Sequence, residues 1–353
     1  MQANHFYKAL CAAAIMILAF VVFWEYYWRN RGFTIGYNDD KVIWAANRKK
    51  IYAPETTVFI GDSRVKFDID IATWKSLTGE NAVQLAMVGT PARPVLRDLA
   101  NDVNFRGNII LGGAELAFYS LDTLQRETSA RDGLEYYYKE TPAQSLNASL
   151  DFFLESKLVF LEEGKFGLNS LLNSVPIANR PGVFTRTLPP RQFSNSDFFR
   201  QTSETPRLLN DSSLQREVIN YWTASASRAK IKPITGDTLQ VFFKQYKNSI
   251  DKIKARGGKI AFIRPPSTGA VLERENRFYP RDQYWDRLIS YTGTTGFYYT
   301  DHPEIAHLTC PEQSHLTPDD AIIFTKALIH YLRENGWTFP RSNESDADRN
   351  IKQ

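Results

Sequence analysis

The chain has 353 residues, of which 43% are apolar and 23% are charged, so wholesale disorder, a collagen-like repeat and a coiled coil are excluded. Its 43 basic and 39 acidic residues leave a formal net charge of +4, which is too small to indicate a nucleic-acid partner. Two cysteines exclude a disulfide-rich scaffold and a cysteine-based zinc module. We expect neither a metal nor another cofactor.

Residues 9–24 form an apolar run without a charge, and the aromatic belt Tyr26, Tyr27 and Trp28 extends it to a plausible membrane span. No small-residue cleavage site follows the run, so an uncleaved anchor over residues 9–28 is favoured over a cleaved signal peptide. A buried helix of a soluble protein is disfavoured because the segment is apolar on every face. The flanking charges do not by themselves fix the orientation of the anchor.

Residues 29–55 are predicted to form a polar connector, with an aromatic patch at residues 42–45. Short apolar runs then alternate with helical patterns, which predicts a flavodoxin-like α/β fold with a parallel sheet of about five strands covered on both faces. The expected strands are residues 56–60, 81–86, 107–112, 259–263 and 296–300, and the expected helices are residues 91–103, 238–255 and 318–335.

The alternation of strands and helices stops between about residues 120 and 235, where the sequence is mostly helical and includes a proline-rich stretch. Because strands resume afterwards, we interpret this stretch as an insertion within one domain that covers residues 56–339. Residues 340–353 are charged and rich in Ser and Asn, which is typical of a disordered tail.

The first candidate catalytic residue is Ser63, in the sequence Gly61-Asp62-Ser63 directly after an apolar strand. A serine on such a turn is exposed at the carboxyl edge of a parallel sheet, where α/β proteins bind ligands. Its own backbone N–H, near a helix N-terminus, could stabilise an oxyanion. The alternative interpretation is an ordinary helix N-cap, because Asp and Ser are common there.

The second candidate is His315, which lies three residues after Glu312 and just before a helix that starts with Thr317 and Pro318. A histidine in this loop could reach the serine at the same sheet edge, and the acid on the same turn could hold the imidazole tautomer. Asp301, at the end of the fifth expected strand, is the fallback for the acid. The alternative for His315 is a surface histidine without a catalytic role.

Together these motifs resemble the SGNH (GDSL-like) hydrolase superfamily, whose blocks supply a serine, an acid and a histidine in this order. The resemblance covers roughly residues 55–115 and 255–335, and it implies a catalytic triad of Ser63, Glu312 and His315. The segment Gln84 to Gly89 is similar to the second block of the family, which implies that the amides of Ser63 and Gly89 form the oxyanion hole.

The chain departs from the family pattern at two blocks. The acid is Glu312 where the family usually has Asp, and the third block reads Gly112-Gly-Ala-Glu115, without the asparagine that contributes to the family's oxyanion hole. One such donor is often worth roughly 3 kcal/mol. We therefore expect slow hydrolysis and a bias toward acyl transfer. Arg64 and Arg264 are weak candidates for substrate contact, and structural ion pairs are the favoured alternative for both.

The resemblance is to membrane-anchored members that handle acyl groups of bacterial envelope polymers, as in alginate O-acetylation and teichoic-acid D-alanylation. It implies a single-pass protein of the bacterial cytoplasmic membrane with its domain on the periplasmic side. The expected function is a serine esterase or O-acyltransferase that acts on a polysaccharide or other envelope polymer, with a membrane-bound O-acyltransferase as a possible partner. The alternative is a non-catalytic module that binds the polymer or that partner. Tyr136, Tyr137 and Tyr138 are candidates for an acceptor surface or for core packing.

Overall fold

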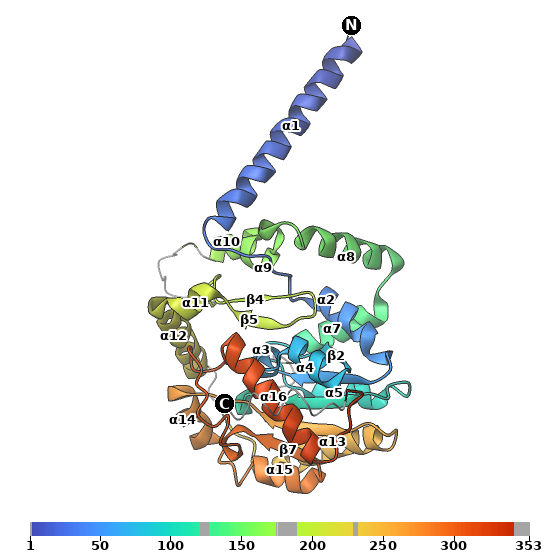
Figure 1. The fold of residues 1–353 in the computed structure, drawn as a ribbon, viewed down its shortest axis with the longest axis vertical. Coiled ribbons are helices and arrows are strands. Elements are labelled where there is room, and N and C mark those ends of the chain that lie inside the picture. The colour runs from blue at the N-terminus through green and yellow to red at the C-terminus, as the bar shows by residue number, and fades with distance from the viewer. Residues whose placement is uncertain (1, 121–126, 174, 176–188, 229–231, 342–353) are drawn as a thin grey trace.

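In the computed structural model of the protein, a long N-terminal helix projects from a globular α/β part (Figure 1). The structure describes residues 2–120, 127–173, 175, 189–228 and 232–341. The projecting helix is α1 (Gln2–Arg29), and its segment His5–Arg29 is long and apolar enough to cross a membrane. Between Lys8 and Glu25 it carries no charged residue, so an aqueous environment would leave its whole surface unfavourably hydrated.

The globular part is built on a five-stranded sheet in which every pair of neighbouring strands is parallel, in the order β2-β1-β3-β6-β7. Doubly wound α/β proteins use this order, in which the chain reverses its direction of winding after the second strand. The prediction of an α/β fold with a parallel sheet of about five strands is confirmed. The strands are β1 (Thr56–Gly61), β2 (Asn81–Gln84), β3 (Asn108–Gly112), β6 (Ile260–Arg264) and β7 (Thr295–Tyr298).

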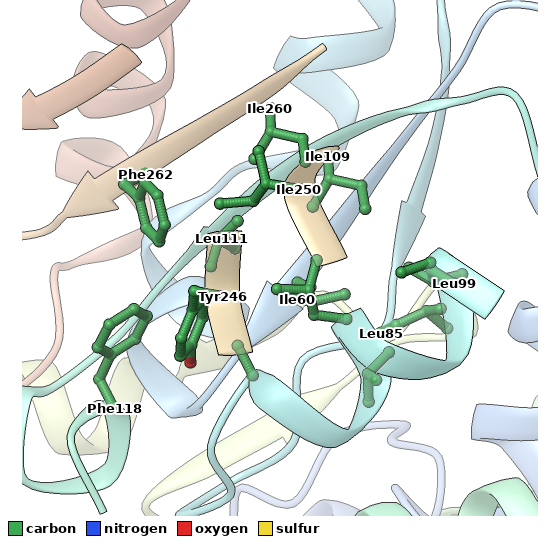
Figure 2. Packing of buried hydrophobic residues seen from close by; sticks show 14 of the residues in the cluster. Ile60, Leu85, Leu99, Ile109, Leu111, Phe118, Tyr246, Ile250, Ile260 and Phe262 are labelled. Atoms are coloured by element: carbon green, nitrogen blue, oxygen red, sulfur yellow. The ribbon is translucent and has the colours of Figure 1, made fainter. Parts of the chain in front are cut away.

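Side chains alternate between the two faces of the sheet, and both faces are buried by helices. On one face, Ile60, Leu111 and Phe262 pack with residues such as Tyr246 and Leu99 (Figure 2). Phe59, Ile110 and Ile263 point to the other face, where the second hydrophobic cluster forms. The first face is covered by α5 (Arg93–Asn101) and α13 (Gly236–Lys254), and the second by α3 (Ser63–Asp68), α4 (Ile71–Thr78) and α16 (Pro318–Glu334).

The segment between α1 and the first strand is more structured than a polar connector. It contains α2 (Lys41–Arg48) and the 3₁₀ helix η1 (Lys49–Tyr52). Ile43 and Trp44 of α2 are buried, and the Trp44 indole donates to the Leu85 carbonyl oxygen (3.0 Å). The aromatic patch at residues 42–45 is therefore part of the core.

The chain between β3 and β6 is mostly helical, as predicted, and it also forms a two-stranded antiparallel hairpin. Its elements are α6 (Glu115–Phe118), α7 (Thr128–Lys139), α8 (Pro142–Glu155), η2 (Val159–Leu161), α9 (Glu163–Phe166), α10 (Leu168–Asn173), β4 (Ser194–Ser196), β5 (Thr202–Glu204), α11 (Pro206–Asn210) and α12 (Ser212–Arg228). Part of it, including α8, α9 and α10, lies at the end of the globular part from which α1 projects (Figure 1).

The remaining elements follow β6 and close the fold. They are α14 (Gly269–Phe278), α15 (Trp285–Thr292) and η3 (Tyr299–Asp301). The described chain continues to Arg341, whose backbone N–H donates to the Thr78 carbonyl oxygen (2.8 Å). The rest of the predicted tail lies outside the described residues.

Candidate active site

Ser63 lies at the start of α3, directly after β1, on a turn that two glycines make possible. Gly61 has φ +150°, and a Cβ there would lie 2.2 Å from the Gly112 carbonyl oxygen. Gly113 has φ +143°, and a Cβ there would lie 2.6 Å from the Asp62 carboxylate. Both positions therefore need glycine, because other residues rarely adopt this conformation and a side chain would collide with the neighbouring segment.

Asp62 fixes this turn against the end of β3. Its side chain caps α3 by accepting from the Arg64 N–H (3.0 Å), and its second oxygen accepts from the Ala114 N–H (2.8 Å). Burial raises the pKa of Asp62, although both hydrogen bonds and the nearby Arg64 oppose that effect. Residues 112–115 thus hold the turn at Ser63 through the backbone amide of Ala114.

His315 reaches Ser63 from the loop before α16. Its Nε2 lies 2.9 Å from the Ser63 Oγ, and its Nδ1 lies 2.8 Å from the Glu312 Oε1. The side chains of both Glu312 and His315 are buried, with exposed fractions of 0% and 1%. The structure thus brings together all three residues of the triad expected from the sequence, in hydrogen-bonding geometry.

The loop that carries Glu312 is a tight turn. Gln313 has φ +75°, in the left-handed region that non-glycine residues seldom occupy, and its N–H donates to the Cys310 carbonyl oxygen (3.0 Å). This turn folds the Glu312 carboxylate back, so that it accepts from the backbone N–H groups of His315 (2.6 Å) and Ser314 (3.2 Å) as well as from the imidazole. The acid is therefore fixed within a single turn of chain.

The other Glu312 oxygen accepts a hydrogen bond from the indole N–H of Trp222, on α12 of the insertion. Burial raises the pKa of Glu312, but attraction to the imidazolium form of His315 and the hydrogen bonds from His315 and Trp222 outweigh it, and the pKa lies below its ordinary value. Glu312 thus stays a carboxylate. Sequence reasoning missed Trp222 because it lies ninety residues from Glu312 and no local pattern marks it.

Aromatic and acidic groups hold His315 and its loop in place. The Phe67 ring stacks on the imidazole, with ring centroids 4.2 Å apart. Asp68, at the end of α3, accepts from the Leu316 N–H (2.9 Å), which ties the helix that carries Ser63 to the loop that carries His315. Burial raises the pKa of Asp68 to about 7. Neither residue was singled out from the sequence.

Asp301, the fallback for the acid, lies elsewhere. Its carboxylate is exposed and forms a bidentate ion pair with Arg281, at 2.6 and 2.7 Å. His315 Nδ1, the nitrogen that the orienting acid would bind, is already hydrogen-bonded to Glu312. The geometry therefore favours Glu312 as the residue that orients His315.

Arg64, next to Ser63 in the chain, and Arg264, at the end of β6, belong to a buried ion network, and both are 1% exposed. Both bind Glu275, with Arg64 at 2.6 Å and Arg264 at 2.9 Å, and Arg264 also binds Glu115, at the start of α6. Their guanidinium groups are thus engaged by protein carboxylates, and neither residue lines the cavity at Ser63. This arrangement favours the structural alternative over substrate contact.

Ser63 and His315 open into a cavity of about 2290 Å³. Its walls come from α2, α3, the insertion and the end of α1, including Trp28, Arg31 and Phe33. Met87 and Val88, which precede Gly89, also line it. Gly89 is exposed with φ +64°, and within the described part of the chain its N–H donates to no acceptor, as also holds for the Ser63 N–H. These are the two amides proposed for the oxyanion hole.

A buried polar cluster lines the same cavity one turn of α3 beyond Ser63. The Lys66 ammonium binds Asp39 at 2.5 Å, and Asp39 also binds Arg200 at 2.7 Å. Burial lowers the pKa of Lys66 to about 8, although Asp39 opposes this effect. The three tyrosines at 136–138 do not line the cavity, since Tyr136 and Tyr137 pack against the core and the Tyr138 hydroxyl donates to Asp98 (2.6 Å).

No protein-family model matches this chain, and no curated protein matches it at a significant level. Support for a function therefore comes mainly from the geometry of the site.

Proposed function

We propose that the protein is a membrane-anchored serine esterase or O-acyltransferase of the SGNH type, with Ser63 as nucleophile, His315 as general base and Glu312 as the acid that orients it. The observation that carries the proposal is the continuous hydrogen-bonded chain from Ser63 Oγ through both nitrogens of His315 to the buried Glu312 carboxylate. The strand order β2-β1-β3-β6-β7 supports the proposal, because Ser63 follows the first strand and so lies at the carboxyl edge where doubly wound sheets bind ligands.

In the first step, the Ser63 hydroxyl gives its proton to His315 Nε2 while its oxygen attacks the acyl carbonyl carbon. The negative charge that forms on the carbonyl oxygen is stabilised by the backbone N–H groups of Ser63 and Gly89. His315 then returns the proton to the departing alcohol oxygen as the C–O bond of the ester breaks. Glu312 keeps the imidazole tautomer and stabilises the imidazolium.

In the second step, a hydroxyl group of the acceptor, or water, attacks the acyl-serine while His315 removes its proton. The same imidazole then returns that proton to Ser63 Oγ. The cavity favours a hydroxyl-rich acceptor, because the Lys66, Asp39 and Arg200 cluster supplies polar groups along its wall. We propose a short acyl group such as acetyl, and a polysaccharide or other envelope polymer outside the cytoplasmic membrane as its acceptor. A membrane-bound O-acyltransferase is the proposed partner.

The oxyanion hole of this chain lacks the side-chain donor of the third block, and Ala114 contributes its N–H to Asp62 instead. A weaker oxyanion hole slows attack by water on the acyl-enzyme. A tethered enzyme next to a bound polymer tolerates this loss, because the high effective concentration of acceptor offsets it. We therefore propose that transfer to a polymer hydroxyl exceeds hydrolysis.

The test uses the full chain in detergent or nanodiscs, with a fluorophosphonate probe and a small acetyl ester as substrates. We expect the probe to label Ser63 covalently and to leave Ser63→Ala unlabelled. Ester turnover should fall in Ser63→Ala by a factor of about 10⁴ or more. Acceptor polysaccharide should increase acyl release. Fast hydrolysis indifferent to acceptor would indicate a plain esterase, whereas absence of labelling and turnover would favour the non-catalytic binding module.

A further inference from the structure

Helix α8 has its apolar side chains on the face that points away from the protein. Leu146, Leu150, Phe153 and Leu154 follow helical spacing, and they are 44–66% exposed. The opposite face is the one that packs on the domain. It carries the buried residues Ala148 and Glu155 and the partly buried Phe152. A surface helix of a soluble domain normally turns its apolar stripe inward, so this arrangement is inverted.

The neighbouring helix α10 extends the same kind of surface. Leu168 is 72% exposed and does not line the cavity at Ser63, whereas Leu172 and Val175, each 54% exposed, lie on the side that lines this cavity. Exposed apolar side chains gathered on helices at one end of a domain mark an interaction site.

Contacts with the last turns of α1 fix the level of these helices relative to the anchor. The Glu25 carboxylate accepts from the Val159 N–H (2.9 Å), and the Arg29 guanidinium donates to the Lys157 carbonyl oxygen (3.2 Å). The Trp28 ring packs edge-on against Phe166, with centroids 4.9 Å apart. The segment that joins α8 to α10 is thus held level with the aromatic belt of α1.

The belt residues mark where a membrane-spanning helix leaves the hydrocarbon. Figure 1 shows α8 lying across the end of the globular part from which α1 projects, with α10 beside the base of α1. A helix with an apolar outer face at this level would meet the acyl and headgroup boundary of the bilayer that α1 crosses. The exposed basic residues Arg29, Arg31 and Lys157 in this region also suit the boundary, because lipid phosphate groups are anionic.

We propose that α8 and α10 lie in the membrane interface beside α1 and insert their exposed apolar side chains among the lipids. The occupant of this surface is the bilayer itself. The contact holds the globular part against the membrane at a fixed orientation, which a single helix and a flexible link would not do.

This orientation has a consequence for the site, which rests on the proposed function. The cavity that contains Ser63 is also lined by Trp28, Arg31 and Phe33 at the base of α1. With α8 and α10 on the lipid, the catalytic serine is reached from the membrane-proximal side. A lipid-linked or membrane-delivered acyl donor could then enter without leaving the interface.

The test places an environment-sensitive nitrobenzoxadiazole label on the full chain in vesicles of phosphatidylethanolamine and phosphatidylglycerol. The variants Leu150→Cys, Leu168→Cys and Val103→Cys are each made with Cys11→Ala, and buried Cys310 stays unlabelled. Val103 is the matched control, since it is equally apolar and 69% exposed but lies after α5, away from α8. The unmodified chain, labelled at Cys11 in α1, is the reference for a lipid-exposed site.

We expect the labels at Leu150 and Leu168 to show blue-shifted emission that is lost on adding lipids with a nitroxide near the headgroup. The label at Val103 should show neither effect. The proposal would be overturned if the labels at Leu150, Leu168 and Val103 showed the same emission and the same quenching. A blue shift without quenching would also overturn it, because it would mean that a second protein copy covers the helices. A Cys11 label that lipid nitroxides do not quench would overturn it too, since α1 would then lie outside the bilayer. Ester chemistry enters none of these measurements, so their outcome is independent of the proposed function.

Discussion

The sheet edge and the insertion both contribute to the site, but they reach it in different ways. At the sheet edge, short-range contacts fix each group of the proposed triad: Asp62 caps the helix that begins at Ser63, and Glu312 binds His315 within one turn. In the insertion, Trp222 and Glu204 approach the same groups across large separations in the chain. Local turn geometry thus positions the reacting groups, whereas tertiary packing sets the electrostatic environment around them.

The largest effect is expected from Glu312→Gln, because it acts on the local arrangement itself. A neutral amide no longer stabilises the imidazolium and favours the wrong tautomer, so turnover of a small acetyl ester should fall by a factor of about 10⁴. Asp301→Asn, at the exposed ion pair with Arg281, is the control and should leave turnover within a factor of about two, which is under 0.5 kcal/mol. A larger loss of turnover in Asp301→Asn than in Glu312→Gln would mean that Asp301 orients His315.

The difference between the two regions also explains which features of the structure could be predicted from the sequence. Five strands and a turn ending in Ser63 follow from apolar runs and Gly-Asp-Ser, because backbone periodicity and turn chemistry are local. The distance between Glu312 and His315 follows from their spacing before the Thr317 cap. The sequence does not predict the contacts of Trp222 and Asp68 or the outward apolar face of α8, because each of them depends on which segment of the chain packs nearby. The same limit explains why residues 41–52 read as a connector although Trp44 is buried.

Glu275→Gln tests the buried ion network that holds Arg64 and Arg264. The substitution leaves Arg64 and Arg264 with Glu115 as the single carboxylate of the network, and an uncompensated buried charge costs about 3–5 kcal/mol. The free energy of unfolding, measured by chemical denaturation, should fall accordingly. Glu273→Gln, on the exposed face of the same helix, is the matched control. If Glu275→Gln leaves stability unchanged but raises the KM for the polymer, the two arginines would instead contact the substrate.

Trp222→Phe measures how much the insertion contributes to catalysis. Loss of the indole N–H removes one hydrogen bond to a buried carboxylate, a contact worth about 1.5–3 kcal/mol, so kcat should fall by a factor of about ten or more. In a double-mutant cycle with Glu312→Gln, the second substitution should add little, because both act through the same carboxylate. Additive effects would place Trp222 in the binding of substrate and not in the support of Glu312.

The smallest effect is expected from Glu204→Gln, which tests the electrostatic environment that the insertion imposes. Glu204 on β5 is 3% exposed, and neither of its carboxyl oxygens has a hydrogen-bond partner among the described residues. Burial, together with the neighbouring Glu312 and Asp68, raises its pKa from the ordinary 4.5 to about 9. The folded protein therefore keeps this carboxyl protonated at neutral pH.

The sign of the resulting pH dependence is set by proton linkage. Between pH 4.5 and about 9 the folded state binds the Glu204 proton more tightly than the unfolded chain does, so this group makes the free energy of unfolding fall as pH rises through that window. Glutamine cannot titrate, so Glu204→Gln should flatten this part of the stability curve, and its free energy of unfolding relative to the unsubstituted protein should increase from pH 5 to pH 8. Glu217→Gln, an exposed residue on α12, should leave the slope unchanged. A slope that survives in Glu204→Gln would mean that water reaches Glu204 and that the insertion does not shield the carboxylates beside His315.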